Sequence, residues 1–581
     1  MRLPLSLGGP PLDQDIIISF EHFGFQYTAQ AAPTLYDINL NIRRSEKVLI
    51  AGPSGCGKST LAHCINGLIP ASYPGKATGT LTIGGQDAAR LGLFGLSKIV
   101  GTVLQDADGQ FIGLTVAEDI AFALENDCIP TEEMHRQVEE VAKLVDIKRV
   151  LMHAPHEISG GQKQRVSLGG VMVNDVDVLL FDEPLANLDP ATGKAAIELI
   201  DDIQKRTGCA VIIIEHRLED VLHRHVDRVV VMGSGRIVYD GGPDALLCAD
   251  VLQESGIREP LYVTALKYAG VALTPELHPA SLPELSLNET QREQVRAWFH
   301  RQSVPAEKPE QPLLFQADHM DFSYDNGHHA LRDISLTIRR GEMLSIVGTN
   351  GAGKSTFSKA VCGFVQPQGG TMTLNGQDLK DLSIKERADH IGYVMQNPNQ
   401  MISKIQIFDE VALGLRNRGV AEEKIRIRVE ETLKICGLYP FRNWPVSALS
   451  YGQKKRVTIA SILVLKPDMI LLDEPTAGQD FRHYTEIMDF LSELNASGVT
   501  VVLITHDMHL MQEYTPRAVV FHDGQVIADR SAAQVLNSPE IVAQAHLKET
   551  SLYHLANLCG ITEAEEFTRR FIAADQEVRR A

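Results

Sequence analysis

Short apolar runs recur along the chain, each four or five residues long. Residues 178–181 and 469–472 are continuous apolar runs, which is the pattern of strands that are covered on both faces. Four further runs are interpreted in the same way as strands, at 47–51, 210–214, 343–347 and 500–504. Helical stretches, such as 132–145 and 422–436, alternate with these runs. This alternation predicts a mostly parallel sheet in an α/β fold.

The chain contains a long internal repeat. Gly52-Pro-Ser-Gly-Cys-Gly-Lys-Ser-Thr60 returns as Gly348-Thr-Asn-Gly-Ala-Gly-Lys-Ser-Thr356, with the two lysines 296 residues apart. Four further motifs return after 290 or 291 residues: Val103-Leu-Gln105 as Val394-Met-Gln396, Ile158-Ser-Gly-Gly-Gln162 as Leu449-Ser-Tyr-Gly-Gln453, Phe181-Asp-Glu-Pro184 as Leu472-Asp-Glu-Pro475, and Glu215-His216 as Thr505-His506. So constant a separation indicates two copies of one domain.

The repeat divides the chain into five expected parts. These are an N-terminal extension over 1–14, a first domain over 15–273, a linker over 274–312, a second domain over 313–540 and a C-terminal helical tail over 541–581. The linker holds six prolines, which prevent a continuous helix or a central strand. One short helix could form within it, at 288–302. We therefore expect a linker with limited structure.

Charge and hydropathy exclude several classes of function. The chain has 581 residues and a formal net charge of −19, which argues against broad binding of a nucleic-acid backbone, although a local basic groove could still exist. Its longest apolar runs are far shorter than the roughly 20 residues that a helix needs to cross a bilayer. Residues 1–11 lack the apolar core of a signal peptide. We expect a cytoplasmic protein with no nucleic-acid partner.

The repeated glycine-rich motif has the G-x-x-x-x-G-K-[ST] pattern of a phosphate cradle. Its glycines let backbone N–H groups turn toward a phosphate, and the following helix presents its positive end. Lys58 and Lys354 would reach the β- and γ-phosphates of a nucleotide, and Ser59 and Ser355 would bind Mg²⁺. The expected nucleotide contacts are Gly52, Pro53, Ser54, Gly55, Cys56, Gly57, Lys58, Ser59 and Thr60, with Gly348, Thr349, Asn350, Gly351, Ala352, Gly353, Lys354, Ser355 and Thr356 in the second copy.

Paired carboxylates close one apolar strand in each copy. The first acid of each pair could hold Mg²⁺, and the second could polarise the water that attacks the γ-phosphate. The metal-binding candidates are thus Asp182 and Asp473, and the catalytic candidates are Glu183 and Glu474.

Three more residue types recur at matching positions. His216 and His506 each follow an apolar strand, where a side chain could reach the γ-phosphate. Gln105 and Gln396 are amides placed to sense Mg²⁺ and the attacking water. The last pair is Tyr27 and Tyr324, which could stack on an adenine ring or belong to the core.

Two segments resemble the signature motif of ATP-binding-cassette (ABC) ATPases, Ile158-Ser-Gly-Gly-Gln-Lys-Gln-Arg165 and Leu449-Ser-Tyr-Gly-Gln-Lys-Lys-Arg456. With the other motifs, the resemblance covers nearly all of 15–250 and 313–540. It implies two tandem P-loop domains, each a mixed-sheet core with a helical signature subdomain, that use ATP and Mg²⁺. In that family two cassettes pack head to tail. The resemblance therefore implies one site from Lys58 with Ser450, Gly452 and Gln453, and another from Lys354 with Ser159, Gly160, Gly161 and Gln162.

The chain departs from the family pattern at a few positions. Tyr451 replaces the first signature glycine of the second copy. The loop after the paired acids reads Asn187-Leu188-Asp189 in one copy and Gly478-Gln479-Asp480 in the other. The two sites need not hydrolyse ATP equally, although both keep the lysine, the acids and the histidine.

Details of the motifs are similar to those of the energy-coupling-factor importers of vitamins and metals. A second glutamine follows the first in Gln105-Asp-Ala-Asp-Gly-Gln110 and in Gln396-Asn-Pro-Asn-Gln400. A fused double cassette of this type is similar to an import ATPase for thiamine or its hydroxymethylpyrimidine precursor. The resemblance implies a peripheral protein on the cytoplasmic face of the membrane, with separate permease subunits and a substrate-binding membrane subunit. The docking candidates, which could equally be core residues, are Phe111, Ile112, Met401 and Ile402.

Two other functions stay open for a twin cassette. One is the ATPase of a simple-sugar importer, although such proteins usually carry degenerate motifs in one half. The other is a soluble translation factor on ribosomes, which should have a long charged helical linker instead of a proline-broken one.

Overall fold

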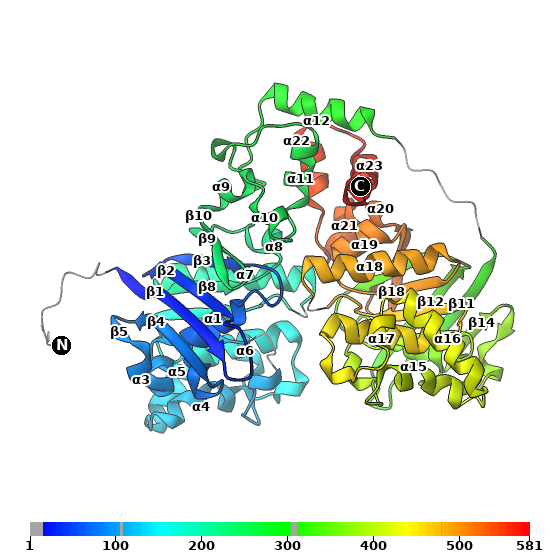
Figure 1. Cartoon of the computed structure of the whole chain (residues 1–581), viewed down its shortest axis with the longest axis horizontal. Helices are drawn as coiled ribbons and strands as arrows, with labels where there is room; N and C mark the ends of the chain where they lie inside the picture. The colour runs from blue at the N-terminus through cyan, green and yellow to red at the C-terminus, as the bar shows by residue number, and fades with distance from the viewer. Residues whose placement is uncertain (1–14, 105–107, 187, 304–310, 478, 581) are drawn as a thin grey trace, which may run out of the picture. The chain divides into compact units, whose positions relative to one another are not determined.

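The computed structural model describes residues 15–104, 108–186, 188–303, 311–477 and 479–580. These divide into two compact units (Figure 1). The first comprises the chain up to 188 together with 192–267 and 272–287. The second comprises 189–191, 268–271 and the chain from 288 onward. Each unit contains one of the two sequence repeats.

The first unit holds an antiparallel sheet of strand order β2-β1-β4-β5 and a six-stranded sheet of order β10-β9-β3-β8-β7-β6. In the larger sheet the neighbours are parallel except for β9 and β10. The strands are β1 Ile16–Tyr27, β2 Leu35–Arg43, β3 Lys47–Ala51, β4 Gly75–Ile83, β5 Gln86–Asp87, β6 Val100–Val103, β7 Val178–Asp182, β8 Ala210–Ile214, β9 Arg228–Gly233 and β10 Arg236–Gly241.

The second unit repeats both sheets, with orders β12-β11-β14-β15 and β16-β17-β18-β13-β19-β20. Its strands are β11 Leu313–Ser323, β12 His329–Arg339, β13 Met343–Gly348, β14 Gly369–Leu374, β15 Gln377–Asp378, β16 Ile391–Val394, β17 Met469–Asp473, β18 Thr500–Ile504, β19 Arg517–His522 and β20 Gln525–Ser531. The predicted α/β fold with two mixed-sheet domains is confirmed, and each apolar run singled out in the sequence forms a strand.

Helices surround the sheets in both repeats. Those up to residue 268 are α1 Lys58–Ile65, α2 Leu68–Ala71, α3 Ala88–Ser97, α4 Val116–Asn126, α5 Thr131–Leu144, α6 Gly160–Met172, α7 Pro190–Thr207, α8 Leu218–Val221, α9 Pro243–Cys248, α10 Val251–Glu254 and α11 Leu261–Tyr268. The later ones are α12 Glu289–Arg301, α13 Lys354–Cys362, α14 Ile384–Arg387, α15 Ile407–Arg416, α16 Glu422–Ile435, α17 Tyr451–Leu463, α18 Phe481–Ala496, α19 Met508–Tyr514, α20 Ala532–Leu536, α21 Pro539–Gln544, α22 Ser551–Leu558 and α23 Ala564–Arg580.

The central strands of each large sheet are buried along their whole length. In the first unit β3 lies between β8 and β9, and all five residues of β3 and of β8 are buried. The corresponding β13 lies between β18 and β19. Parallel strands need cover on both faces, which explains why these runs lack polar alternation. The loops that carry the motifs leave the carboxyl ends of these strands, where parallel sheets bind ligands.

The segment predicted as a linker carries a helix and contributes to a core. Helix α12 begins at the capping residue Asn288, whose side chain accepts a hydrogen bond from the Gln291 amide. Its Trp298 and Phe299 pack against aromatic rings of α23, and Figure 1 shows the two helices close together. The prolines flank this helix without interrupting it. The tail beyond 538 is helical, as expected.

In the part of the chain that the structure describes, every helix is too short or too polar to cross a membrane.

Candidate functional site

The glycine-rich loops connect a central strand to the helix that follows it, β3 to α1 and β13 to α13. Glycine is required in this loop for steric reasons. A Cβ atom on Gly348, which has φ 140°, would lie 1.9 Å from the carbonyl oxygen of Phe521. Gly353 has φ 97° and a Cβ there would lie 2.5 Å from the Ala330 carbonyl oxygen. The backbone of the loop can therefore curl only because side chains are missing there.

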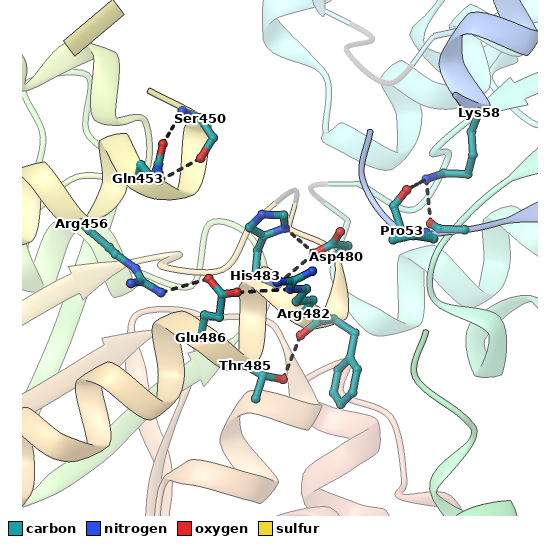
Figure 2. A network of polar contacts seen from close by, with 12 residues as sticks. Pro53, Lys58, Ser450, Gln453, Arg456, Asp480, Arg482, His483, Thr485 and Glu486 are labelled. Atoms are coloured by element: carbon teal, nitrogen blue, oxygen red, sulfur yellow. Dashed lines mark hydrogen bonds and ion pairs between the residues drawn. The ribbon is translucent and has the colours of Figure 1, made fainter. Parts of the chain in front are cut away.

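The cradle lysines are buried and folded back into their own loops. Lys58 Nζ donates to the carbonyl oxygens of Gly52, at 2.7 Å, and Pro53, at 3.0 Å (Figure 2). Lys354 Nζ donates to the same two loop positions, Gly348 at 2.7 Å and Thr349 at 2.8 Å. Burial lowers the pKa of Lys354, while Glu474 and Asp473 act in the opposite direction. The loops thus hold an ammonium group where a phosphate would bind.

The predicted base-stacking tyrosines lie against the first turn of the cradle helix. Tyr27 shares a hydrogen bond of 3.0 Å with the Thr60 hydroxyl, and Tyr324 shares one of 3.1 Å with that of Thr356. Both rings are half-buried. This contact fixes each ring beside the phosphate loop, and its stacking on adenine stays a prediction.

Oxygen ligands for a cation meet in the second repeat. Ser355 Oγ donates to Asp473 Oδ2 at 3.2 Å, and the Tyr393 hydroxyl donates to the same oxygen at 3.0 Å. In the first repeat, burial, together with Glu183 and Glu215, raises the pKa of Asp182 to about 6, although Lys58 acts in the opposite direction. Buried carboxylates without a cation favour the protonated form.

The catalytic candidate of the second repeat is held by the neighbouring loop. His506 Nδ1 donates to Glu474 Oε1 at 2.7 Å, and the Thr505 hydroxyl donates to Oε2 at 3.2 Å. Burial alone would raise the pKa of Glu474, but His506, Lys354 and Thr505 together hold it below its usual value. Burial raises the pKa of Glu183 in the first repeat, and the nearby His216 opposes this effect.

The signature segments form the N-termini of α6 and α17. Ser159 accepts a hydrogen bond from the Gln162 amide, and Gln162 reaches back to the Ser159 amide. Ser450 and Gln453 form the same reciprocal pair (Figure 2). This capping box leaves the remaining first-turn N–H groups of Gly160, Gly161 and Gly452 at a positive helix end, which suits an anion.

Of the two glutamine candidates, the structure describes only Gln396. Gln105 lies outside the described residues. Gln396 is exposed just after β16, and its backbone carbonyl accepts hydrogen bonds from Lys455 Nζ, at 2.9 Å, and from the Tyr451 hydroxyl, at 3.3 Å. The unusual signature tyrosine therefore contacts the glutamine loop of its own repeat.

Within each unit the structure brings together the cradle lysine, the paired acids and the histidine. Tyr393, Lys455 and Glu215 also lie near the paired acids, although the sequence motifs assign them no role. Comparison of the repeats position by position could have found them, because the equivalent residues are Thr102, Gln164 and Thr505. A position at which two otherwise matched motifs differ indicates a residue with a role in only one of the two repeats.

Comparison with known proteins decides the family. A family model described as "ABC transporter" matches residues 35–186 and 331–477, which include both cradles and both signature segments. The chain belongs to the ABC transporter family. Such proteins hydrolyse ATP to drive transport, so the chain is an ABC ATPase with two cassettes. A second family model, described as "ATP-binding cassette cobalt transporter", matches residues 249–322.

Relatives of this ABC ATPase match it over almost its full length. An ABC transporter ATP-binding protein of Clostridium perfringens is 55% identical over 98% of this chain and 100% of its own. One of Enterococcus faecalis is 57% identical over 97% of this chain and 99% of its own. A solved structure, cbiO1 of Clostridium perfringens from the ABC transporter complex cbiONQ, is 33% identical and covers 42% of this chain and 100% of its own, with a TM-score of 0.39.

Proposed function

We propose that the chain is the ATP-hydrolysing motor of an energy-coupling-factor importer and drives separate membrane permease subunits. The observation that carries this proposal is the match of residues 249–322 to a cobalt-transporter family, beside two cassettes that both keep the lysine, the paired acids and the histidine. The same match favours a metal ion as the cargo over a vitamin or vitamin precursor. A peripheral position on the cytoplasmic face and a substrate-binding membrane subunit belong to this proposal.

Two composite ATP sites would perform the chemistry. One would combine the Lys58 cradle with the helix end at Ser450 and Gly452, and the other the Lys354 cradle with that at Ser159 and Gly161. In each site the lysine would bind phosphate oxygens, and the first-turn amides of the signature helix would cover the γ-phosphate.

The second cassette fits Mg²⁺ and a general base. The Ser355 hydroxyl and the Asp473 carboxylate, 3.2 Å apart, are the hard oxygen ligands that Mg²⁺ prefers. When bound, Mg²⁺ would neutralise phosphate charge. Glu474 is kept ionised by its neighbours, so it can accept a proton from the attacking water. The first cassette offers Ser59, Asp182 and Glu183 for the same roles.

Exposed apolar side chains beside the glutamine loops are candidate permease contacts. Among the residues predicted for docking, Ile112 is exposed, whereas Met401 and Ile402 pack partly into the helical core. Leu114 and Ile405 are 82% and 78% exposed and lie 291 residues apart, at matching positions before α4 and α15. Apolar groups this exposed at both equivalent places favour a partner surface.

Purification from cells in gentle detergent tests the proposal. Wild-type chain should bring down membrane permease subunits and support uptake of labelled cobalt or thiamine. The double variant Leu114→Ser and Ile405→Ser should lose both while keeping basal ATP hydrolysis, because both side chains are outside the core. Val238→Ser, at an apolar position that is 50% exposed elsewhere on the first cassette, is the control and should change neither. If the chain is recovered with ribosomes, or if no membrane protein is recovered with it, the importer function is contradicted.

A further inference from the structure

The two cassettes differ at the residue before the repeated histidine, His216 or His506. This position follows β8 in the first cassette, where it is Glu215, and β18 in the second, where it is Thr505. Both residues are fully buried at 0% exposure, and the amide of each donates to the central strand, to Ile50 or Ile346. The two cassettes therefore make the same backbone hydrogen bond at this position, whereas the side chain differs.

In the second cassette the histidine is bound to the catalytic candidate. The backbone N–H of His506 donates to Glu474 Oε1 at 3.1 Å, and its ring Nδ1 donates to the same oxygen at 2.7 Å. Thr505 supports this arrangement, because its hydroxyl donates to Glu474 Oε2 at 3.2 Å. Three donors from one loop thus fix the orientation of this carboxylate.

In the first cassette the same two groups of the histidine face Glu215. The backbone N–H of His216 donates to Glu215 Oε1 at 2.9 Å, and ring Nδ1 lies 3.2 Å from that oxygen. The Glu215 carboxylate also accepts from the amides of Leu185, at 3.3 Å, and Arg217, at 3.2 Å. A buried carboxylate with this many donors is firmly held, so it keeps the histidine loop in place.

We propose that Glu215 is a positioning residue that takes up the donor groups of His216 in place of Glu183 and makes the first cassette the slower of the two ATP sites. The histidine that orients the general base in the second cassette is engaged by a different carboxylate in the first. This inference rests on the proposed catalytic role of the two glutamates, but it requires neither a permease nor a cargo.

Site-resolved trapping of nucleotide tests the proposal on the purified chain. Photoreactive ATP is trapped with vanadate during turnover, and the labelled peptides are assigned to one cassette or the other. We expect wild-type label mainly in the second cassette. Glu215→Thr should raise trapping in the first cassette at least threefold, because His216 is released to Glu183. Glu215→Gln keeps an oxygen in the place of Oε1, which accepts from the His216 N–H, and should stay closer to wild type than Glu215→Thr.

The reciprocal variant gives an independent readout. Thr505→Glu should lower trapping in the second cassette at least threefold while labelling at 4 °C without turnover, which reports binding alone, stays unchanged in both cassettes. Equal wild-type labelling, or no shift of trapping with either variant, would overturn the proposal. If Glu215→Thr does not fold, the result with Thr505→Glu decides. Absence of ATP binding and of trapping in the wild type would instead contradict the assignment of the ATP sites themselves.

Discussion

At the scale of single residues, Lys455 is a buried lysine whose ammonium group contacts the glutamine loop. It is 1% exposed, and its ammonium group donates to the carbonyl oxygens of Met395, at 2.8 Å, and Gln396, at 2.9 Å. Burial lowers the pKa of Lys455 to about 8, although Asp473 and Glu474 act in the opposite direction. A charged group is thus buried to hold the glutamine loop, at a cost in folding free energy.

This cost predicts a pH dependence of stability. As pH rises, folded Lys455 loses its proton near pH 8, whereas the unfolded chain keeps it up to about pH 10.4. The unfolded state therefore binds more protons in this window, and stability rises with pH there. Relative to Lys455→Gln, the wild type should gain up to about 1.4 kcal/mol per pH unit between pH 8 and 10 in urea unfolding.

The comparison needs a control for other titrating groups. Lys359→Gln, which removes an exposed ammonium from α13, should be followed through the same pH series. A difference between wild type and Lys455→Gln that is constant from pH 7.5 to 10 would refute the prediction.

The general-base candidates give a second prediction at this scale. Replacing Glu183 and Glu474 together by Gln should lower steady-state ATP hydrolysis on the order of 10²-fold or more, since the proton acceptor for water is lost. ATP binding, measured by equilibrium titration of the same protein, should persist. Turnover equal to that of wild type would rule out this role.

At the scale of elements, the turn from β13 into α13 depends on one glycine. Gly348→Ala would place a Cβ against the Phe521 carbonyl oxygen of β19, so the strand and the loop could not both keep their positions. We expect a loss of about 3 kcal/mol in stability, with loss of nucleotide binding to the second cassette. Gly351→Ala is the matched control, because its Cβ would meet open space and only its positive φ would cost about 1 kcal/mol. Equal effects of the two substitutions on unfolding and binding would contradict this account.

Local patterns predicted these elements well and long-range contacts poorly. The apolar runs and glycine spacing gave the strands and cradles, because burial of a parallel strand and a tight phosphate loop each require particular residue types nearby in sequence. Helix α12 was expected from its residues, but its packing on α23 was not, since Trp298 and Phe567 are 269 positions apart. The roles of Glu215 and Lys455 depend on hydrogen bonds that only the folded chain defines.

At the scale of the whole molecule, the composite sites predict crossed effects. Ser450→Arg should impair nucleotide trapping in the cassette of Lys58, and Ser159→Arg in that of Lys354, because a bulky cation would replace the hydroxyl at the helix end. Ser531→Arg removes the same kind of capping box at α20, away from both cradles and both signature segments in the sequence, and should leave trapping intact. Impairment confined to the cassette that carries each substitution would contradict the head-to-tail arrangement.

The repeat also affects how such a protein can change over generations. In an assembly of two identical chains, one codon specifies each residue in both copies. Any mutation in the loop that follows the strand equivalent to β8 and β18 would therefore change both ATP sites at once. Here Glu215 and Thr505 are specified by separate codons. Natural selection can therefore keep the rate of ATP hydrolysis in one cassette while the rate in the other changes. Because both cassettes are encoded by one gene, the difference between them is inherited together.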